Sequence, residues 1–87
     1  MTDRYAGIPR AMSDVTRRSI RALLDAYNAT WFDLIRRDRA RRYRSARRAL
    51  YWLLHCRNWS LPRIGRLCNR DHTTILYALR KVNAWKS

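Results

Sequence analysis

The chain has 87 residues, the length of a single domain, which leaves no room for a separate catalytic domain. Twenty basic residues, nearly all arginine, stand against six aspartates and no glutamate, for a formal net charge of +14. Such an excess indicates a polyanionic partner, so nucleic acid is expected ahead of an anionic membrane surface. No apolar run approaches the roughly 18 residues of a membrane span, and the N-terminus does not resemble a signal peptide.

The composition also predicts an all-α fold, because two glycines and two prolines are too few breakers for strands and turns. We expect a small bundle of about five helices. Cys56 and Cys68 are expected to be buried free thiols, since their spacing with His55 and His72 matches no zinc finger. The sequence therefore predicts a protein that is not an enzyme, with no metal site, cofactor or small-molecule substrate.

Residues 1–12 are expected to form a disordered N-terminal tail, and residues 13–87 the domain. A first helix is predicted from a cap at Ser13 or Asp14 to Asn28, which tolerates the left-handed conformation of a helix end. Its apolar residues recur on one face: Ile20, Leu23, Leu24 and Tyr27. Thr30 is expected to cap a short second helix that carries Trp31, Phe32, Leu34 and Ile35.

An arginine-rich run, RRDRARRYRSARR, occupies residues 36–48. One interpretation is a run of solvated charges. The other is a loop followed by a helix start, which together contact the phosphates or a groove of a nucleic acid. The second interpretation is favoured because blocks of like charge repel unless something neutralises them. A third helix is predicted from about Ser45 to Arg57, and its apolar residues on more than one face indicate the central helix. Three tryptophans are expected in the core or at its edge: Trp31, Trp52 and Trp59.

Two shorter helices are predicted at the C-terminal end. Ser60 is a good N-cap with Pro62 in the first turn, residues 68–70 form a turn, and Asp71 caps the last helix. The last helix has a core stripe of Ile75, Leu79 and Val82, and its other side presents His72, Thr73, Tyr77, Arg80 and Lys81. Two such helices, the second polar and basic on its outer side, match a helix-turn-helix that binds DNA.

These helices resemble the C-terminal DNA-binding domain, domain IV, of the bacterial replication initiator DnaA. The resemblance rests on SLPRIGRL at 60–67 and RDHTTILYALRKV at 70–82, and it extends over roughly residues 15–83. It implies an all-α helix-turn-helix fold and a short asymmetric duplex target, the DnaA box. It also implies that Asp71, His72, Thr73 and Thr74 enter the major groove.

By position, the resemblance implies that Arg39, or alternatively Arg41, enters the adjacent minor groove. Contacts with phosphate are expected from a wider set: Arg47, Arg48, Ser60, Leu61, Pro62, Arg70, Tyr77, Arg80 and Lys81.

The chain departs from the family pattern at several points. The turn Cys68-Asn69-Arg70-Asp71 is one residue shorter than the usual Phe-Gly-Gly-Arg-Asp, which can tilt the last helix. Arg63 stands where the family usually has an acidic residue, and Leu54 stands where it usually has a basic one. The Arg-Gln pair of the family is replaced here by Ala46-Arg47 or by Arg47-Arg48. The family's ATPase domain has no counterpart here, and Met1 with its distinct tail favours a stand-alone relative over an excised domain.

Two functions are therefore considered. The first is sequence-specific binding of double-stranded DNA at DnaA-box-like sites, as a monomer associated with the nucleoid in the cytoplasm, which regulates replication initiation or transcription without ATPase activity. The alternative is a protein-interaction regulator that mimics the last domain of DnaA and binds DnaA or one of its partners. The intact segment 71–74 and the net charge of +14 favour DNA, because a mimic needs neither.

Overall fold

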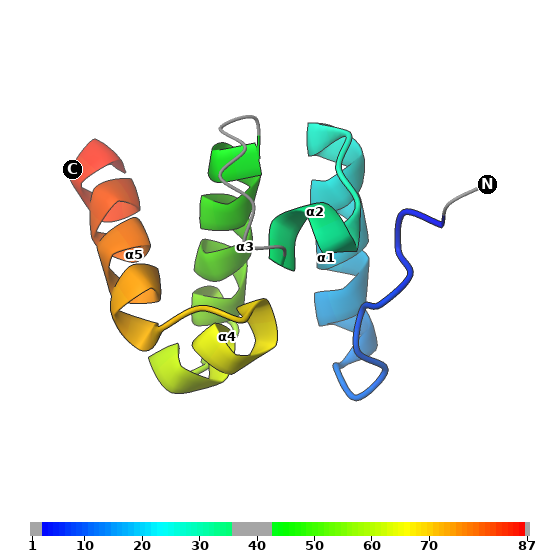
Figure 1. Cartoon of the computed structure of the whole chain (residues 1–87), viewed down its shortest axis with the longest axis horizontal. Helices are drawn as coiled ribbons and strands as arrows, with labels where there is room; N and C mark the ends of the chain where they lie inside the picture. Colours follow the sequence, from blue (N-terminus) through cyan, green and yellow to red (C-terminus); the bar gives the residue numbers. More distant parts are fainter. Residues whose placement is uncertain (1–2, 36–42, 87) are drawn as a thin grey trace.

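A computed structural model describes residues 3–35 and 43–86, with side chains described as far as Lys81. These residues form five helices and no strand: α1 (Asp14–Tyr27), α2 (Trp31–Ile35), α3 (Arg44–Cys56), α4 (Leu61–Cys68) and α5 (His72–Lys86). Figure 1 shows α1 and α5 at opposite ends of the molecule, with α3 between them and α4 crossing below α3. The expected all-α bundle with a C-terminal helix-turn-helix is confirmed.

The predicted caps of α1 are present at both ends. Ser13 Oγ accepts a hydrogen bond from the Thr16 N–H at 3.3 Å, and Asn28 ends the helix in the left-handed conformation with φ 51°. Ile20 and Leu24 are fully buried against the core. Tyr27 is the last helical residue of the same apolar face, and 42% of its surface is exposed because it lies at the end of the helix.

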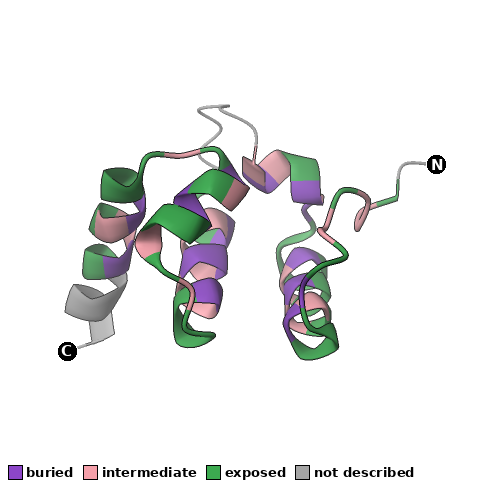
Figure 2. Ribbon diagram, turned by 90° about the horizontal axis from the view of Figure 1, so that it is seen from below, coloured by how far each residue is buried: buried purple, intermediate pink, exposed green. Residues whose placement is uncertain are grey.

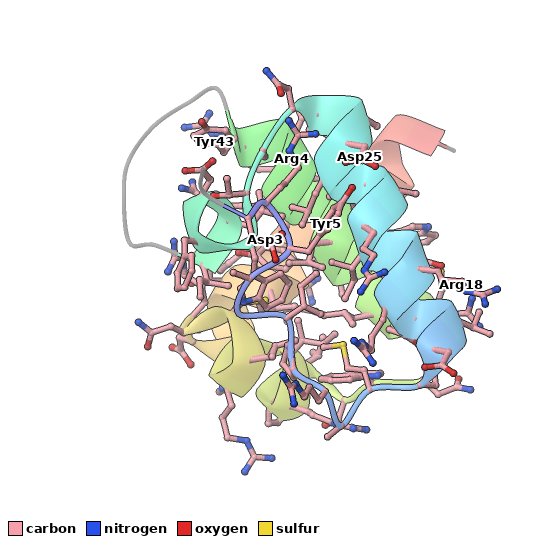
Figure 3. The ribbon with its side chains drawn as sticks, turned by 90° about the vertical axis from the view of Figure 1, so that its right-hand side faces the viewer. Asp3, Arg4, Tyr5, Arg18, Asp25 and Tyr43 are labelled. Carbon is pink, nitrogen blue, oxygen red and sulfur yellow. The ribbon has the colours of Figure 1, made fainter. Side chains whose placement is uncertain are left out.

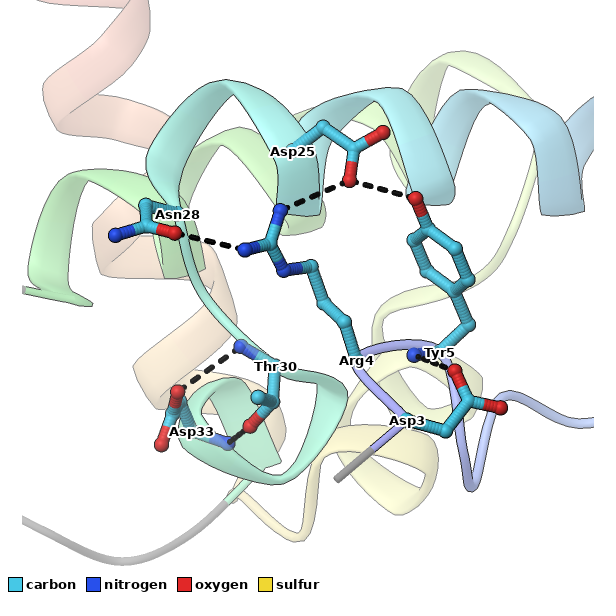
Figure 4. A network of polar contacts seen from close by, with 7 residues as sticks. All are labelled: Asp3, Arg4, Tyr5, Asp25, Asn28, Thr30 and Asp33. Atoms are coloured by element: carbon cyan, nitrogen blue, oxygen red, sulfur yellow. Dashed lines mark hydrogen bonds and ion pairs between the residues drawn. The ribbon is translucent and has the colours of Figure 1, made fainter. Parts of the chain in front are cut away.

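Helix α2 starts with a reciprocal cap (Figure 4). The Thr30 N–H donates to Asp33 Oδ2 at 2.9 Å, and the Asp33 N–H donates to Thr30 Oγ1 at 3.2 Å. Each side chain thus satisfies a backbone donor that the helix itself leaves unpaired. Trp31 and Leu34 are buried, whereas Phe32 lies on the outer side and is half exposed.

The N-terminal segment differs from the disordered tail that we expected, because residues 3–12 pack against α1 and α2. Arg4 bonds to Asp25 at 3.0 Å and to Asn28 Oδ1 at 2.7 Å, and the Tyr5 hydroxyl donates to Asp25 at 2.6 Å (Figures 3 and 4). The Tyr5 and Arg4 hydrogen bonds hold the pKa of Asp25 below its usual value. Met12, further along the segment, is buried in the core.

Helix α3 is the central element, since it contacts each of the other four helices. Its buried side chains are Ala46, Leu50, Tyr51 and Leu54, and Figure 2 shows the buried positions on the facing sides of the helices. Trp31 is buried and Trp52 and Trp59 pack at the core edge, as predicted.

The two cysteines lie in different environments. Cys68 is buried as expected, and burial raises the pKa of its thiol to about 12, so the thiol stays protonated. The same expectation for Cys56 is wrong, because this last residue of α3 is exposed.

Candidate nucleic-acid interface

The turn between α4 and α5 is closed around Gly65. Ser60 caps α4 by accepting the Arg63 N–H at 3.3 Å, and Asn69 ends it in the left-handed conformation with φ 56°. The Arg70 N–H donates to the Gly65 carbonyl oxygen at 2.8 Å. A Cβ on Gly65 would lie 2.6 Å from the Arg70 carbonyl oxygen, so only glycine allows the chain to fold back this tightly. The predicted cap at Ser60 is confirmed.

Asp71 organises the first turn of α5. One of its carboxylate oxygens accepts the Thr73 hydroxyl at 2.7 Å, and the other lies 3.0 Å from His72 Nδ1. The Thr73 hydroxyl, the charge of His72 and backbone N–H groups of both residues lower the pKa of Asp71. The carboxylate is therefore ionised at neutral pH and caps the positive end of α5, as predicted.

The four residues expected in the major groove are all exposed at this helix start: Asp71, His72, Thr73 and Thr74. The next residue, Ile75, is fully buried and fixes the helix to the core. Because Nδ1 of His72 faces Asp71, the ring presents Nε2 to a ligand. Because the Thr73 hydroxyl faces Asp71, its methyl group remains for a contact. Such short groups at the start of a helix suit base edges in the major groove.

A cationic groove of about 420 Å³ lies between α3 and α5, beside Thr74. Its walls bring together five of the residues expected to contact phosphate: Arg47, Arg48, Arg70, Tyr77 and Lys81. The sequence reasoning missed Arg44, which lines the same groove, although its place in the arginine-rich run was a usable signal. Tyr51 and Ala78 complete the lining.

The other expected phosphate contacts lie elsewhere. Ser60, Leu61 and Pro62 are at the start of α4, and Arg80 is exposed on α5 without lining the groove. The two arginines expected in the minor groove, Arg39 and Arg41, lie outside the described residues.

Two of the groove arginines also support the fold. Arg47 reaches the Asp33 carbonyl oxygen at 3.5 Å, which ties α3 to α2. Arg70 donates to the carbonyl oxygen of Asn69 at 3.1 Å and to that of Cys68 at 3.5 Å, so it braces the turn before α5. Their side chains are therefore positioned by the domain itself.

The segment of the chain that precedes this helix start carries formal charge of one sign. From residue 39 to residue 70 the sequence contains ten arginines and no acidic residue. A surface of this kind attracts a polyanion and concentrates it near the exposed start of α5. Among the described residues, no helix is both long and apolar enough to cross a membrane.

The comparisons with known proteins agree with this geometry. The chain matches the family model described as the bacterial dnaA protein helix-turn-helix over residues 18–82. Over 70 residues it is 34% identical to the chromosomal replication initiator protein DnaA of Corynebacterium jeikeium (strain K411), a match that covers 78% of this chain and 12% of that protein. No solved structure matches. The helix-turn-helix of this family is a DNA-binding domain and is not catalytic by itself.

Proposed function

Because this chain belongs to the family of bacterial DnaA helix-turn-helix domains, we propose that it binds double-stranded DNA at DnaA-box-like sites and thereby regulates replication initiation or transcription. The match covers 12% of the initiator, so the proposal concerns this DNA-binding unit and assigns it no ATPase step.

One observation carries the proposal: an exposed polar helix start adjoins a cationic groove, with Thr74 belonging to both. The helix start offers His72 Nε2 and the Thr73 methyl group to base edges, which carry the sequence information of the major groove. The groove offers Arg44, Arg48 and Lys81 to phosphates, which fix the register of the protein on the duplex. Base contact and backbone contact thus occur side by side.

Two further contacts follow from the family resemblance. Arg39, with Arg41 as the alternative, reaches the neighbouring minor groove, whose negative potential is strongest where A·T pairs make it narrow. At the start of α4, Ser60, Leu61 and Pro62 lie against the phosphate backbone of the DNA. Together with Arg47, Arg70, Tyr77 and Arg80, these residues complete the proposed interface of a monomer on one box.

The regulatory effect follows from occupancy. A domain of this size covers the box on which an initiator would otherwise assemble. At a box shared with the initiator, binding of this chain is therefore inhibitory.

Competition between this chain and purified full-length initiator on one labelled DnaA box tests the proposal. We expect the chain to displace the initiator from the box at concentrations that leave a scrambled duplex unbound. The matched control is the His72→Ala, Thr73→Ala double variant, which keeps every arginine and should lose this displacement.

If the chain binds both duplexes alike and co-purifies with the initiator or one of its partners, the DNA proposal is wrong. The chain would then act as a protein-interaction regulator that mimics the last domain of the initiator.

A further inference from the structure

Trp59 and Arg63 form a stacked pair between α3 and α4. The guanidinium carbon of Arg63 lies 3.7 Å from the centre of the Trp59 ring. Both residues are anchored through the backbone: the Trp59 N–H donates to the Leu54 carbonyl oxygen at 3.1 Å, and the Arg63 N–H donates to Ser60 Oγ at 3.3 Å. Trp59 also packs against the hydrophobic core. The pair therefore has a fixed place on the surface.

The stacking leaves the hydrogen-bonding edge of Arg63 available. Arg63 is exposed, and within residues 3–35 and 43–81 its guanidinium has no carboxylate or hydrogen-bond partner. Arg4 and Arg70, by contrast, use their guanidinium groups on Asp25 and on the carbonyl oxygens of the turn. Stacking involves the face of the guanidinium, whereas its N–H groups lie in the plane and point outward.

The surroundings of the pair favour an anion. Arg57 precedes it at the end of α3, and Arg66 follows one turn later on α4, both exposed. The nearest acidic residues along the chain are Asp38 and Asp71. In a helix-turn-helix, the first of the two helices crosses the DNA backbone while the second enters the major groove. Here the first helix is α4, and Arg63 is in its first turn.

We propose that Arg63, held in place by Trp59, binds a backbone phosphate where α4 crosses the duplex. Arginine can meet a phosphate with two parallel N–H···O bonds, provided that its plane is correctly oriented. The indole ring supplies that orientation in advance, so less side-chain freedom is lost on binding. Arg63 is the binding residue and Trp59 is its positioning residue. The inference rests on the proposed DNA binding but not on recognition of a particular sequence.

The test measures affinity and salt dependence on a DnaA-box duplex and on a scrambled duplex. Arg63→Ala should weaken binding to both by about tenfold and reduce the log-log salt slope by about one. Arg63→Lys keeps the charge and should leave the slope unchanged with an intermediate affinity. Trp59→Leu should weaken both duplexes about two- to fivefold.

Two controls separate positioning from damage to the fold. Arg18→Ala removes the same charge from α1, where the side chain points away from the rest of the molecule (Figure 3), and should have a much smaller effect. In the Arg63→Ala background, Trp59→Leu should cause no further loss of affinity. A purely structural role of Trp59 would instead weaken binding equally in both backgrounds.

The inference is overturned if Arg63→Ala binds both duplexes as well as Arg18→Ala does. That result leaves the proposed function intact. Equal binding of the unaltered chain to both duplexes would overturn sequence recognition and leave the role of Arg63 standing.

Discussion

At the start of α5, one carboxylate orients the two side chains beside it. Asp71 accepts the Thr73 hydroxyl and faces Nδ1 of His72, at 2.7 Å and 3.0 Å respectively. Its own oxygens are thereby engaged within the protein. The groups that remain for a base edge are Nε2 of His72 and the Thr73 methyl group. The proposed base contacts of His72 and Thr73 therefore depend on the position of Asp71.

Replacing His72 or Thr73 with alanine tests whether these side chains recognise bases. Each change should cost about 1–3 kcal/mol of binding free energy on the preferred duplex and much less on a scrambled one, because phosphate contacts are untouched. Equilibrium titration of each variant against both duplexes measures the difference. Equal losses on the two duplexes would mean that these residues do not contact bases.

Residues whose role depends on near neighbours in the chain were predictable from sequence. The caps at Ser13, Asn28 and Ser60 are examples, because a cap is made within a few residues of itself. The solvent exposure of individual side chains was harder to predict, as Tyr27 and Cys56 show. Helical spacing predicts which residues share a face, but it does not show where the neighbouring helix ends.

At the scale of elements, the short turn between α4 and α5 determines how the recognition helix is presented. This turn is one residue shorter than is usual in the family. In the structure the Arg70 N–H reaches the Gly65 carbonyl oxygen, and segment 71–74 stays exposed. The absence of a side chain at Gly65 makes this closure possible.

Gly65→Ala should therefore destabilise the domain. The new Cβ would meet a backbone oxygen at 2.6 Å, and backbone cannot move aside as a flexible side chain can. We expect a loss of about 1–3 kcal/mol in the free energy of unfolding, measured by urea denaturation followed by circular dichroism. Arg66→Ala, the exposed neighbour in the same helix, should change stability by less than about 0.5 kcal/mol. Equal stability of Gly65→Ala and the unaltered chain would contradict this account of the turn.

Contacts between distant elements were not predictable from local pattern. Arg4 and Asp25 are 21 residues apart, and nothing in the composition of residues 1–12 indicates their ion pair. The same holds for the cationic groove, which joins the start of α3 to the middle of α5. The motif indicated which residue types bind DNA, and only the packing of the helices shows which of them meet.

For the whole molecule, the distribution of charge is as informative as its total. The described acidic residues of the N-terminal half take part in hydrogen bonds or ion pairs within the domain, as with Asp25 and Asp33. The arginine-rich half carries the groove and the exposed helix start. A strongly basic surface of this kind binds any duplex by releasing counterions, and specificity must be added by contacts with bases.

The most direct test of the central claim is a titration of the 87-residue chain against two labelled duplexes of equal length, a DnaA box and its scrambled counterpart, at two salt concentrations. We expect tighter binding to the box at both salt concentrations. We also expect both affinities to fall with salt, with a log-log slope of about −0.9 per phosphate neutralised. Equal affinity for the two duplexes, or an affinity that does not depend on salt, would contradict the account.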